Sequence, residues 1–219
     1  MRTAMRQRLA GLYLVADLSM PEDKLVPAVK SAIAGGVQLV QIWNENKTNS
    51  ERMLRVCKEI VSMTKEASVT LFVNNDLDLA MRLGADGVHF DDFKKSGSEA
   101  RSTLGEQALV GYTCGNDASL VRKAAEFGGD YISFCAVFPS PSVQSCDIVP
   151  LEAVRQAKQV VSIPVFASGG ITLRNAHLVM EAGADGLAIA SSILRADDPQ
   201  REATSFRAII DRYLKTRKN

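Results

Sequence analysis

The sequence lacks the features that mark membrane, secreted and nucleic-acid-binding proteins. No apolar run approaches the roughly 18 residues that a membrane span needs, and the basic start, 1–8, lacks the apolar centre of a signal peptide. The net charge is +1, and apart from the chain ends the sequence has no basic stripe that would suit nucleic acid or an anionic membrane. The four cysteines show no CxxC spacing, which fits reduced thiols. These absences predict a cytoplasmic protein whose partners are small molecules.

What the sequence does contain is the composition of a globular protein. Its 219 residues are 46% hydrophobic and 23% charged, which is enough for one sizeable core and lies within the range of a single α/β barrel. We therefore expect residues 1–219 to form a single domain. A homodimer through the outer helices stays open, because no single patch stands out in the sequence.

Short apolar runs alternate with helical patterns along the whole chain. Strands are expected at 11–16, 37–43, 69–73, 108–112 and 163–167, among others, and helices opening at Pro21 and covering 50–65, 77–83 and 200–214. Four similar junctions, each a helix end followed by glycine and a strand, recur about every 50 residues, or two βα units: 34–37, 83–86, 127–130 and 182–185. The pattern predicts an α/β fold, a parallel eight-stranded (βα)8 TIM barrel. A doubly wound open sheet is the alternative, but no GxGxxG follows the first strand.

The last two strands end in small residues that suit an anion. Gly169 and Gly170 follow the seventh strand, and Ala190, Ser191 and Ser192 follow the eighth. Backbone N–H groups, hydroxyls and a helix start would converge there, at the usual phosphate site of a barrel. An ordinary turn that merely needs glycine is the alternative. Two such turns in succession favour a phosphorylated small molecule.

The other strand ends supply amides, hydroxyls, thiols and acids. The candidate side chains are Gln41, Trp43, Asn74, Asn75, Asp76, His89, Asp91, Asp92, Thr113, Cys114, Cys135, Ser140 and Ser142. Trp43 suits either a stacking surface or a plug over the mouth. His89 reads as a hydrogen-bonded structural histidine ahead of a catalyst, and the two adjacent aspartates as a helix start ahead of a cation site.

The cysteines can be interpreted either as functional thiols or as packing residues. Cys114 and Cys135 end neighbouring strands and Cys146 follows in the next loop, which would suit a thiol nucleophile or a soft-metal site. Packing is favoured, because no histidine lies nearby in sequence to activate a thiol. The hydroxyls of Ser140 and Ser142 are good donors for phosphate.

Several segments together resemble the thiamine-phosphate synthase and TenI family. They are 36–41, 73–74, 78–80, 84–90, 130–132, 137–139, 169–171 and 183–186, and the likeness extends from Leu12 to Ile193. The resemblance implies a (βα)8 barrel. It also implies an activity that joins a hydroxymethylpyrimidine diphosphate to a thiazole phosphate, with loss of pyrophosphate and with magnesium. TenI-like relatives act instead as thiazole tautomerases.

On the thiazole-phosphate side the resemblance is close. The Thr-x-Thr loop of the family becomes 140–142, which keeps both hydroxyls, and the Gly-Gly-Ile loop and the Ala190-Ser191 turn are intact. By the same resemblance the phosphate-binding and substrate-binding residues are Gln41, Asn74, Ser140, Ser142, Gly169, Gly170, Ala190 and Ser191.

On the diphosphate side the resemblance fails. Trp43 and Glu45 stand at two cationic places, Val143 replaces a lysine, and the two metal aspartates fall on Asn75 and Lys94. A leaving diphosphate needs cationic or metal compensation, and each such group is typically worth about 10²–10³ in rate.

Three functions stay open on this basis. The first is synthase-family chemistry in thiamine biosynthesis, binding a thiazole-like phosphate with the diphosphate half degraded. The second is a TenI-like isomerase or a non-catalytic binder, although the tautomerase histidine after the fifth strand is Gly115 here. The third is a different chemistry assisted by Cys114 or Cys135, with Thr113 as a further catalytic candidate.

Overall fold

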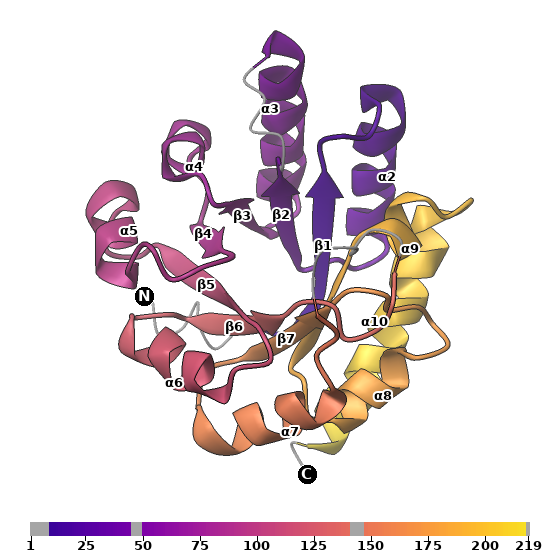
Figure 1. The fold of residues 1–219 in the computed structure, drawn as a ribbon. Coiled ribbons are helices and arrows are strands. Elements are labelled where there is room, and N and C mark those ends of the chain that lie inside the picture. The colour runs from indigo at the N-terminus through magenta and orange to yellow at the C-terminus, as the bar shows by residue number, and fades with distance from the viewer. Residues whose placement is uncertain (1–8, 45–49, 141–146, 218–219) are drawn as a thin grey trace.

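The computed structural model describes residues 9–44, 50–140 and 147–217. They form a closed barrel of eight parallel strands, with helices around the outside (Figure 1). The predicted (βα)8 barrel is confirmed. Within these ranges no helix combines the length and the apolar character needed to cross a membrane.

Each strand pairs with the next one in sequence, and the last pairs with the first. The strands are β1 (Gly11–Asp17), β2 (Leu39–Trp43), β3 (Thr70–Asn74), β4 (Gly87–Phe90), β5 (Leu109–Cys114), β6 (Tyr131–Phe134), β7 (Val165–Ser168) and β8 (Gly186–Ile189). The predicted strands begin up to two residues earlier than the observed ones, because the helix-ending turn extends into the apolar run.

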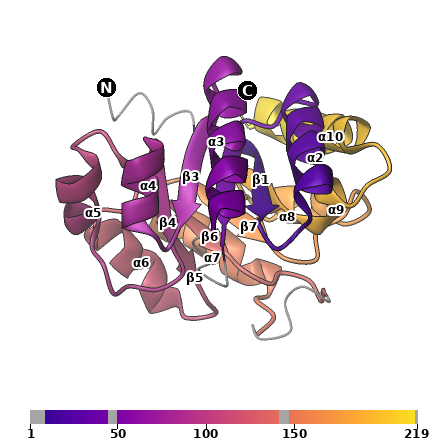
Figure 2. The ribbon, with the colours of Figure 1, turned by 90° about the horizontal axis from the view of Figure 1, so that it is seen from above.

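The helices follow the strands and pack on their outer face. They are α2 (Glu22–Ala34), α3 (Glu51–Glu66), α4 (Leu77–Leu83), α5 (Gly97–Leu104), α6 (Ala118–Glu126), α7 (Leu151–Val160), α8 (Ala176–Glu181), α9 (Ser191–Leu194) and α10 (Pro199–Thr216). Figure 2 shows α10 beside α2, which closes the outer ring as expected. Pro21 is the N-cap of α2 rather than its first residue, and Ser50 caps α3 by accepting from the Met53 N–H.

Two hydrophobic cores lie on the two faces of the barrel wall. The larger one fills the space between strands and helices. The smaller one fills the barrel interior with Leu9, Tyr13, Leu39, Phe72, Leu109, Tyr131, Phe166 and Ala188. Glycines give these rings room: a Cβ on Gly111 would lie 2.1 Å from a Tyr131 ring carbon, and one on Gly186 would lie 2.3 Å from Phe166. Because side chains alternate along a strand, every second residue points to the interior or its mouth.

At the glycine-containing junctions, the last residue before or at the start of a strand makes two hydrogen bonds to one residue of the preceding strand, one through its backbone N–H and one through its side chain. We call this pair of bonds an interstrand clamp. At the start of β6, the Asp130 N–H donates to Val110 O at 2.7 Å, and the Asp130 carboxylate accepts from the Val110 N–H at 2.9 Å. The same two bonds join Asp86 to Leu71, Asp185 to Val165 and, through a glutamine, Gln38 to Leu12. Each even-numbered strand is thus fixed in register on the preceding one at the end of the barrel opposite the mouth.

Candidate functional site

A cavity of about 700 Å³ opens at the carboxyl ends of the strands, and every strand contributes to its wall. Its residues include Tyr13, Val15, Gln41, Trp43, Asn74, Asn75, Asp76, His89, Asp91, Thr113, Ser133, Cys135, Ser140, Ser168, Gly169, Gly170, Ala190, Ser191 and Ser192. The volume is in the range of small-molecule sites. The position is the one at which barrel enzymes carry their chemistry.

A chain of hydrogen bonds crosses the barrel interior beneath this cavity. The Tyr13 hydroxyl lies 2.9 Å from both Gln41 Oε1 and the Tyr131 hydroxyl. The Tyr131 hydroxyl lies 2.9 Å from His89 Nδ1, and His89 Nε2 lies 2.8 Å from Thr113 Oγ1. Side chains from five strands are therefore tied into one polar system.

Two further residues close this chain into a ring. Gln41 Nε2 donates to Asn74 Oδ1 at 3.2 Å, and Asn74 Nδ2 donates to Asp91 Oδ2 at 2.8 Å. Asp91 Oδ1 lies 3.4 Å from Thr113 Oγ1. We call the ring the mouth network, and its members are Tyr13, Gln41, Asn74, His89, Asp91, Thr113 and Tyr131. In the described part of the chain, no buried side-chain nitrogen or oxygen lacks a hydrogen-bond partner.

Burial sets the ionisation of the mouth network. It lowers the pKa of His89 to about 4, against the opposing pull of the Asp91 carboxylate, so His89 is neutral at pH 7. Burial also raises the pKa of the Tyr13 and Tyr131 hydroxyls. His89, Tyr13 and Tyr131 are thus neutral, with their protons committed to hydrogen bonds.

The glycine turn after β7 packs closely against the segment after β6. Gly169 and Gly170 both have positive φ, at 87° and 66°. A Cβ on Gly169 would lie 2.6 Å from Ala136 Cα, and one on Gly170 would lie 2.5 Å from Phe138 O. Both positions therefore need glycine for conformation and for space. The alternative given by the sequence, a turn that requires glycine for its own geometry, thus applies here as well.

The carbonyl groups of this turn are all engaged by protein donors. Ser168 O and Gly169 O accept from the backbone N–H groups of Val137 and Phe138. Gly170 O accepts from Asn175 Nδ2 at 3.0 Å, and Ile171 O accepts from Ser192 Oγ at 2.6 Å. Four successive carbonyls of the turn thus each accept a hydrogen bond from a protein donor.

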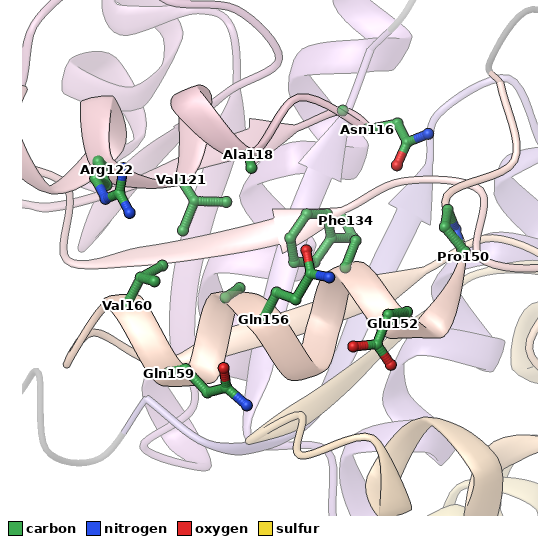
Figure 3. A pocket seen from close by; sticks show the side chains of 13 residues that line it. Asn116, Ala118, Val121, Arg122, Phe134, Pro150, Glu152, Gln156, Gln159 and Val160 are labelled. Atoms are coloured by element: carbon green, nitrogen blue, oxygen red, sulfur yellow. The ribbon is translucent and has the colours of Figure 1, made fainter.

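A second hollow, of about 470 Å³, lies outside the barrel between α6 and α7 (Figure 3). Val121, Phe134 and Val160 form apolar parts of its wall, and Arg122 and Glu152 lie at its edges. No member of the mouth network lines it. This hollow is therefore separate from the chemistry at the strand ends.

Comparison with known proteins gives the family of this chain. The family model described as thiamine monophosphate synthase matches residues 12–193. The chain belongs to that family. The thiamine-phosphate synthase of Thioalkalivibrio sulfidiphilus is 34% identical over 206 residues, which cover 94% of this chain and 97% of that protein. The corresponding protein of Azoarcus sp. is 35% identical and covers 94% and 99%.

A solved structure of the family agrees with this assignment. Thiamine phosphate pyrophosphorylase from Pyrococcus furiosus superposes with a TM-score of 0.83 at 27% identity, covering 96% of this chain and 99% of that one. The resemblance seen in the sequence is thus confirmed at the level of family and fold. Membership in a family of thiamine biosynthesis makes the strand-end cavity the place to look for substrate contacts.

The structure brings most of the predicted site residues to this cavity. Gln41, Asn74, Thr113, Cys135, Ser140, Gly169, Gly170, Ala190 and Ser191 all line it. Ser142, like Glu45, Val143 and Cys146, lies outside the described residues. The assignment of these residues to substrate or phosphate remains a prediction.

Cys114 is the exception among the catalytic candidates, and its position agrees with packing, the interpretation that the sequence favoured. Its side chain is fully buried in the outer core and does not line the cavity. The neighbouring Thr113 points to the mouth, so strand alternation turns Cys114 toward the helices. Burial raises the pKa of the Cys114 thiol to about 12, which leaves it a packing residue.

The two residues at the positions that the resemblance assigns to magnesium, Asn75 and Lys94, are engaged with other protein groups. Asn75 Nδ2 donates to Asp91 Oδ2 at 2.6 Å, and Lys94, which is an ammonium and not a ligand, pairs with Asp92 at 2.7 Å. Asp76 caps α4 by accepting from the Leu79 N–H. Across residues 9–44, 50–140 and 147–217, no three His, Cys, Asp or Glu side chains are grouped to hold a metal ion.

Sequence reasoning missed the two tyrosines that connect the mouth network. Tyr13 lies within β1 and Tyr131 begins β6, and in such apolar runs an aromatic residue reads as core. The available signal was position: Tyr13 lies two residues before Val15, and Tyr131 two before Ser133, so both share the interior face with cavity residues.

Proposed function

We propose that this chain binds a phosphorylated thiazole-like compound at the mouth of the barrel and does not carry out the diphosphate chemistry of a synthase. The observation that carries the proposal is the charge of the cavity wall. Among its described residues there is no lysine or arginine, whereas Asp76 and Asp91 are present. A diphosphate leaving group without a cation or a metal has nothing to offset its charge.

The opposite side of the same cavity supports a monophosphate. Gly169 and Gly170 follow β7, and Ser191 begins α9 after β8. They lie across the barrel from Asp76 and Asp91, which follow β3 and β4. Because the carbonyls of the glycine turn already accept protein hydrogen bonds, the polar groups that this wall can still offer a ligand include the Ser191 hydroxyl. The phosphate would therefore lie at this turn, with the ring of the ligand over the mouth network beside Trp43.

An isomerase is the second candidate, and one contact favours it. His89 Nε2 lies 2.8 Å from Thr113 Oγ1, and Thr113 lines the cavity. A neutral imidazole behind a hydroxyl is a pair that can take up a proton from a bound molecule. This pair could serve where the tautomerase histidine is replaced by Gly115. Cysteine chemistry is the third candidate; of its two cysteines, only Cys135 lines the cavity.

Replacing Ser191 with aspartate tests the phosphate site. We expect Ser191→Asp to weaken thiazole phosphate binding by about tenfold or more, because a carboxylate a few ångströms from the phosphate repels it. Ser191→Asn, which is of the same size and neutral, serves as the control and should have a small effect. Isothermal titration calorimetry with thiazole phosphate measures both. Wild-type protein that fails to bind thiazole phosphate, or equal affinity of the aspartate variant, would contradict the proposal.

A further inference from the structure

One member of the mouth network can only accept hydrogen bonds. The Asp91 carboxylate has no proton to give, and its Oδ2 lies 2.8 Å from an Asn74 amide atom and 2.6 Å from an Asn75 amide atom. Both amides must therefore turn their Nδ2 groups toward Asp91. The orientation of these amides follows from chemistry alone and fixes the direction of the rest of the ring.

The direction passes from Asn74 to the tyrosines through one glutamine. Since Asn74 Nδ2 faces Asp91, its Oδ1 faces Gln41, and Gln41 must donate through Nε2. Gln41 Oε1 is then the atom 2.9 Å from the Tyr13 hydroxyl, and it accepts the Tyr13 proton. Each amide in the chain thus has a single allowed orientation.

The same count of protons applies to the two hydroxyls. Tyr13 has one proton, which goes to Gln41, so in its 2.9 Å contact with Tyr131 it must accept. Tyr131 must then donate its only hydroxyl proton to Tyr13. In its own 2.9 Å contact with His89 Nδ1, Tyr131 accepts, and Nδ1 carries the hydrogen.

We infer that Asp91 sets the tautomer of His89, with the proton on Nδ1 and Nε2 as a hydrogen-bond acceptor. Asp91 does so as a positioning residue, through four intervening side chains. Nε2 accepts the proton of Thr113 Oγ1 at 2.8 Å, and the 3.4 Å separation between Thr113 and Asp91 is then a contact rather than a donated bond. Burial of His89, which is 4% exposed, keeps the ring neutral and makes the assignment a choice between two tautomers.

The assigned tautomer gives the cavity a directed proton acceptor. Thr113 lines the cavity, and its hydroxyl proton points to His89, so its oxygen offers lone pairs to a ligand. A ligand N–H, O–H or acidic C–H could give its proton to Thr113 Oγ1 while the threonine proton moves to His89 Nε2. That step leaves a ligand anion and an imidazolium, and the positive charge would form 3.9 Å from Asp91 Oδ1. With the opposite tautomer, Nε2 would carry a proton and could accept none.

Nitrogen NMR of the ligand-free protein tests the inference directly. The chain has only two histidines, so ¹⁵N-histidine labelling gives two ring systems, and a His177→Gln variant identifies the signals of His89. At pH 7 we expect His89 Nδ1 to be protonated and Nε2 to be unprotonated. A dominant Nε2–H form, or an imidazolium at this pH, would overturn the inference. The outcome does not depend on thiazole phosphate binding, so it can fail or succeed separately from the proposed function.

Two variants test the relay, and one serves as a control. Tyr13→Phe keeps the ring in the core but frees the Tyr131 proton to point at Nδ1, so the tautomer should reverse toward Nε2–H. Asp91→Leu removes the anchor and should lower the ratio of Nδ1–H to Nε2–H by about tenfold, as expected when one net hydrogen bond stops favouring one form. Asp92→Leu, at the next exposed position, removes the carboxylate that pairs with the Lys94 ammonium and accepts from the Lys94 N–H; because Asp92 is not a member of the mouth network, this variant should leave the tautomer ratio unchanged.

The variants give decisive results in either direction. An unchanged His89 spectrum in folded Tyr13→Phe or Asp91→Leu would show that the tautomer is set elsewhere. A change in Asp92→Leu as large as in Asp91→Leu would show that general surface charge, rather than the mouth network, controls it. If one variant fails to fold, the wild-type tautomer and the other variant still decide.

Discussion

Replacing Asp130 with alanine is expected to destabilise the protein by about 3–5 kcal/mol, because it leaves a buried charge without its partner. Asp130 is fully buried, and its Oδ2 lies 2.5 Å from Arg101 Nη2, whose side chain is only 6% exposed. The same carboxylate accepts from the Val110 N–H and so holds β6 on β5. Urea unfolding of wild type and variant measures the difference in the free energy of unfolding.

The matched control for this change lies at another of the interstrand clamps. Asp86 accepts from the Leu71 N–H at 2.8 Å with the same geometry, but it is exposed and has no ion pair within the described residues. Asp86→Ala should therefore cost about 1 kcal/mol, the typical net value of one hydrogen bond. Equal losses in the two variants would mean that the interstrand clamp, and not the buried Arg101 pair, dominates at Asp130.

Acid is expected to destabilise the protein through His89 by about 3 kcal/mol between pH 6.5 and pH 4. Burial lowers the pKa of His89 from 6.5 to about 4 in the folded protein. Between pH 6.5 and pH 4, His89 is protonated in the unfolded chain but stays neutral in the folded protein. The stabilising contribution is thus complete above pH 6.5, and it decreases as the pH falls toward 4.

The difference between wild type and a His89→Gln variant isolates this contribution from that of the carboxylates. We expect the unfolding free energy of wild type, minus that of the variant, to fall by about 3 kcal/mol from pH 7 to pH 4. The absolute stability of the variant does not enter, because only the slope is compared. A difference that stays constant over the window would show that His89 titrates alike in both states, and would remove the reason for its neutrality in the mouth network.

The barrel could be predicted from the sequence because its local signals agree with one another. The junctions at 83–86, 127–130 and 182–185 end a helix with glycine and start a strand, and the period of two βα units fixes the strand count. The role of the aspartate in each junction could not be read, since its acceptor function involves a backbone N–H on a different strand. Hydrogen bonds between residues far apart in the sequence cannot be recognised from the local pattern of apolar and polar residues.

The site was predicted in part, and the limits have a geometric cause. The rim residues follow from the rule that strand ends share one edge, which placed Asn74, Thr113 and Gly169 correctly at the cavity. Cys114 follows Thr113 by one residue, which turns it to the other face of the strand, into the outer core and away from the cavity. The closed mouth network was beyond prediction, because its ring depends on which side chains meet across the barrel interior.

The most direct test of the central claim is an assay for thiamine phosphate, using purified protein, hydroxymethylpyrimidine diphosphate, thiazole phosphate and magnesium. The synthase of Thioalkalivibrio sulfidiphilus, assayed alongside, shows that the reagents are competent. The proposed function, with a monophosphate beside Gly170 and with Asp76, Asp91 and Trp43 on the other side of the cavity, predicts no product above the uncatalysed background. Turnover at a rate comparable with that of the relative would contradict it.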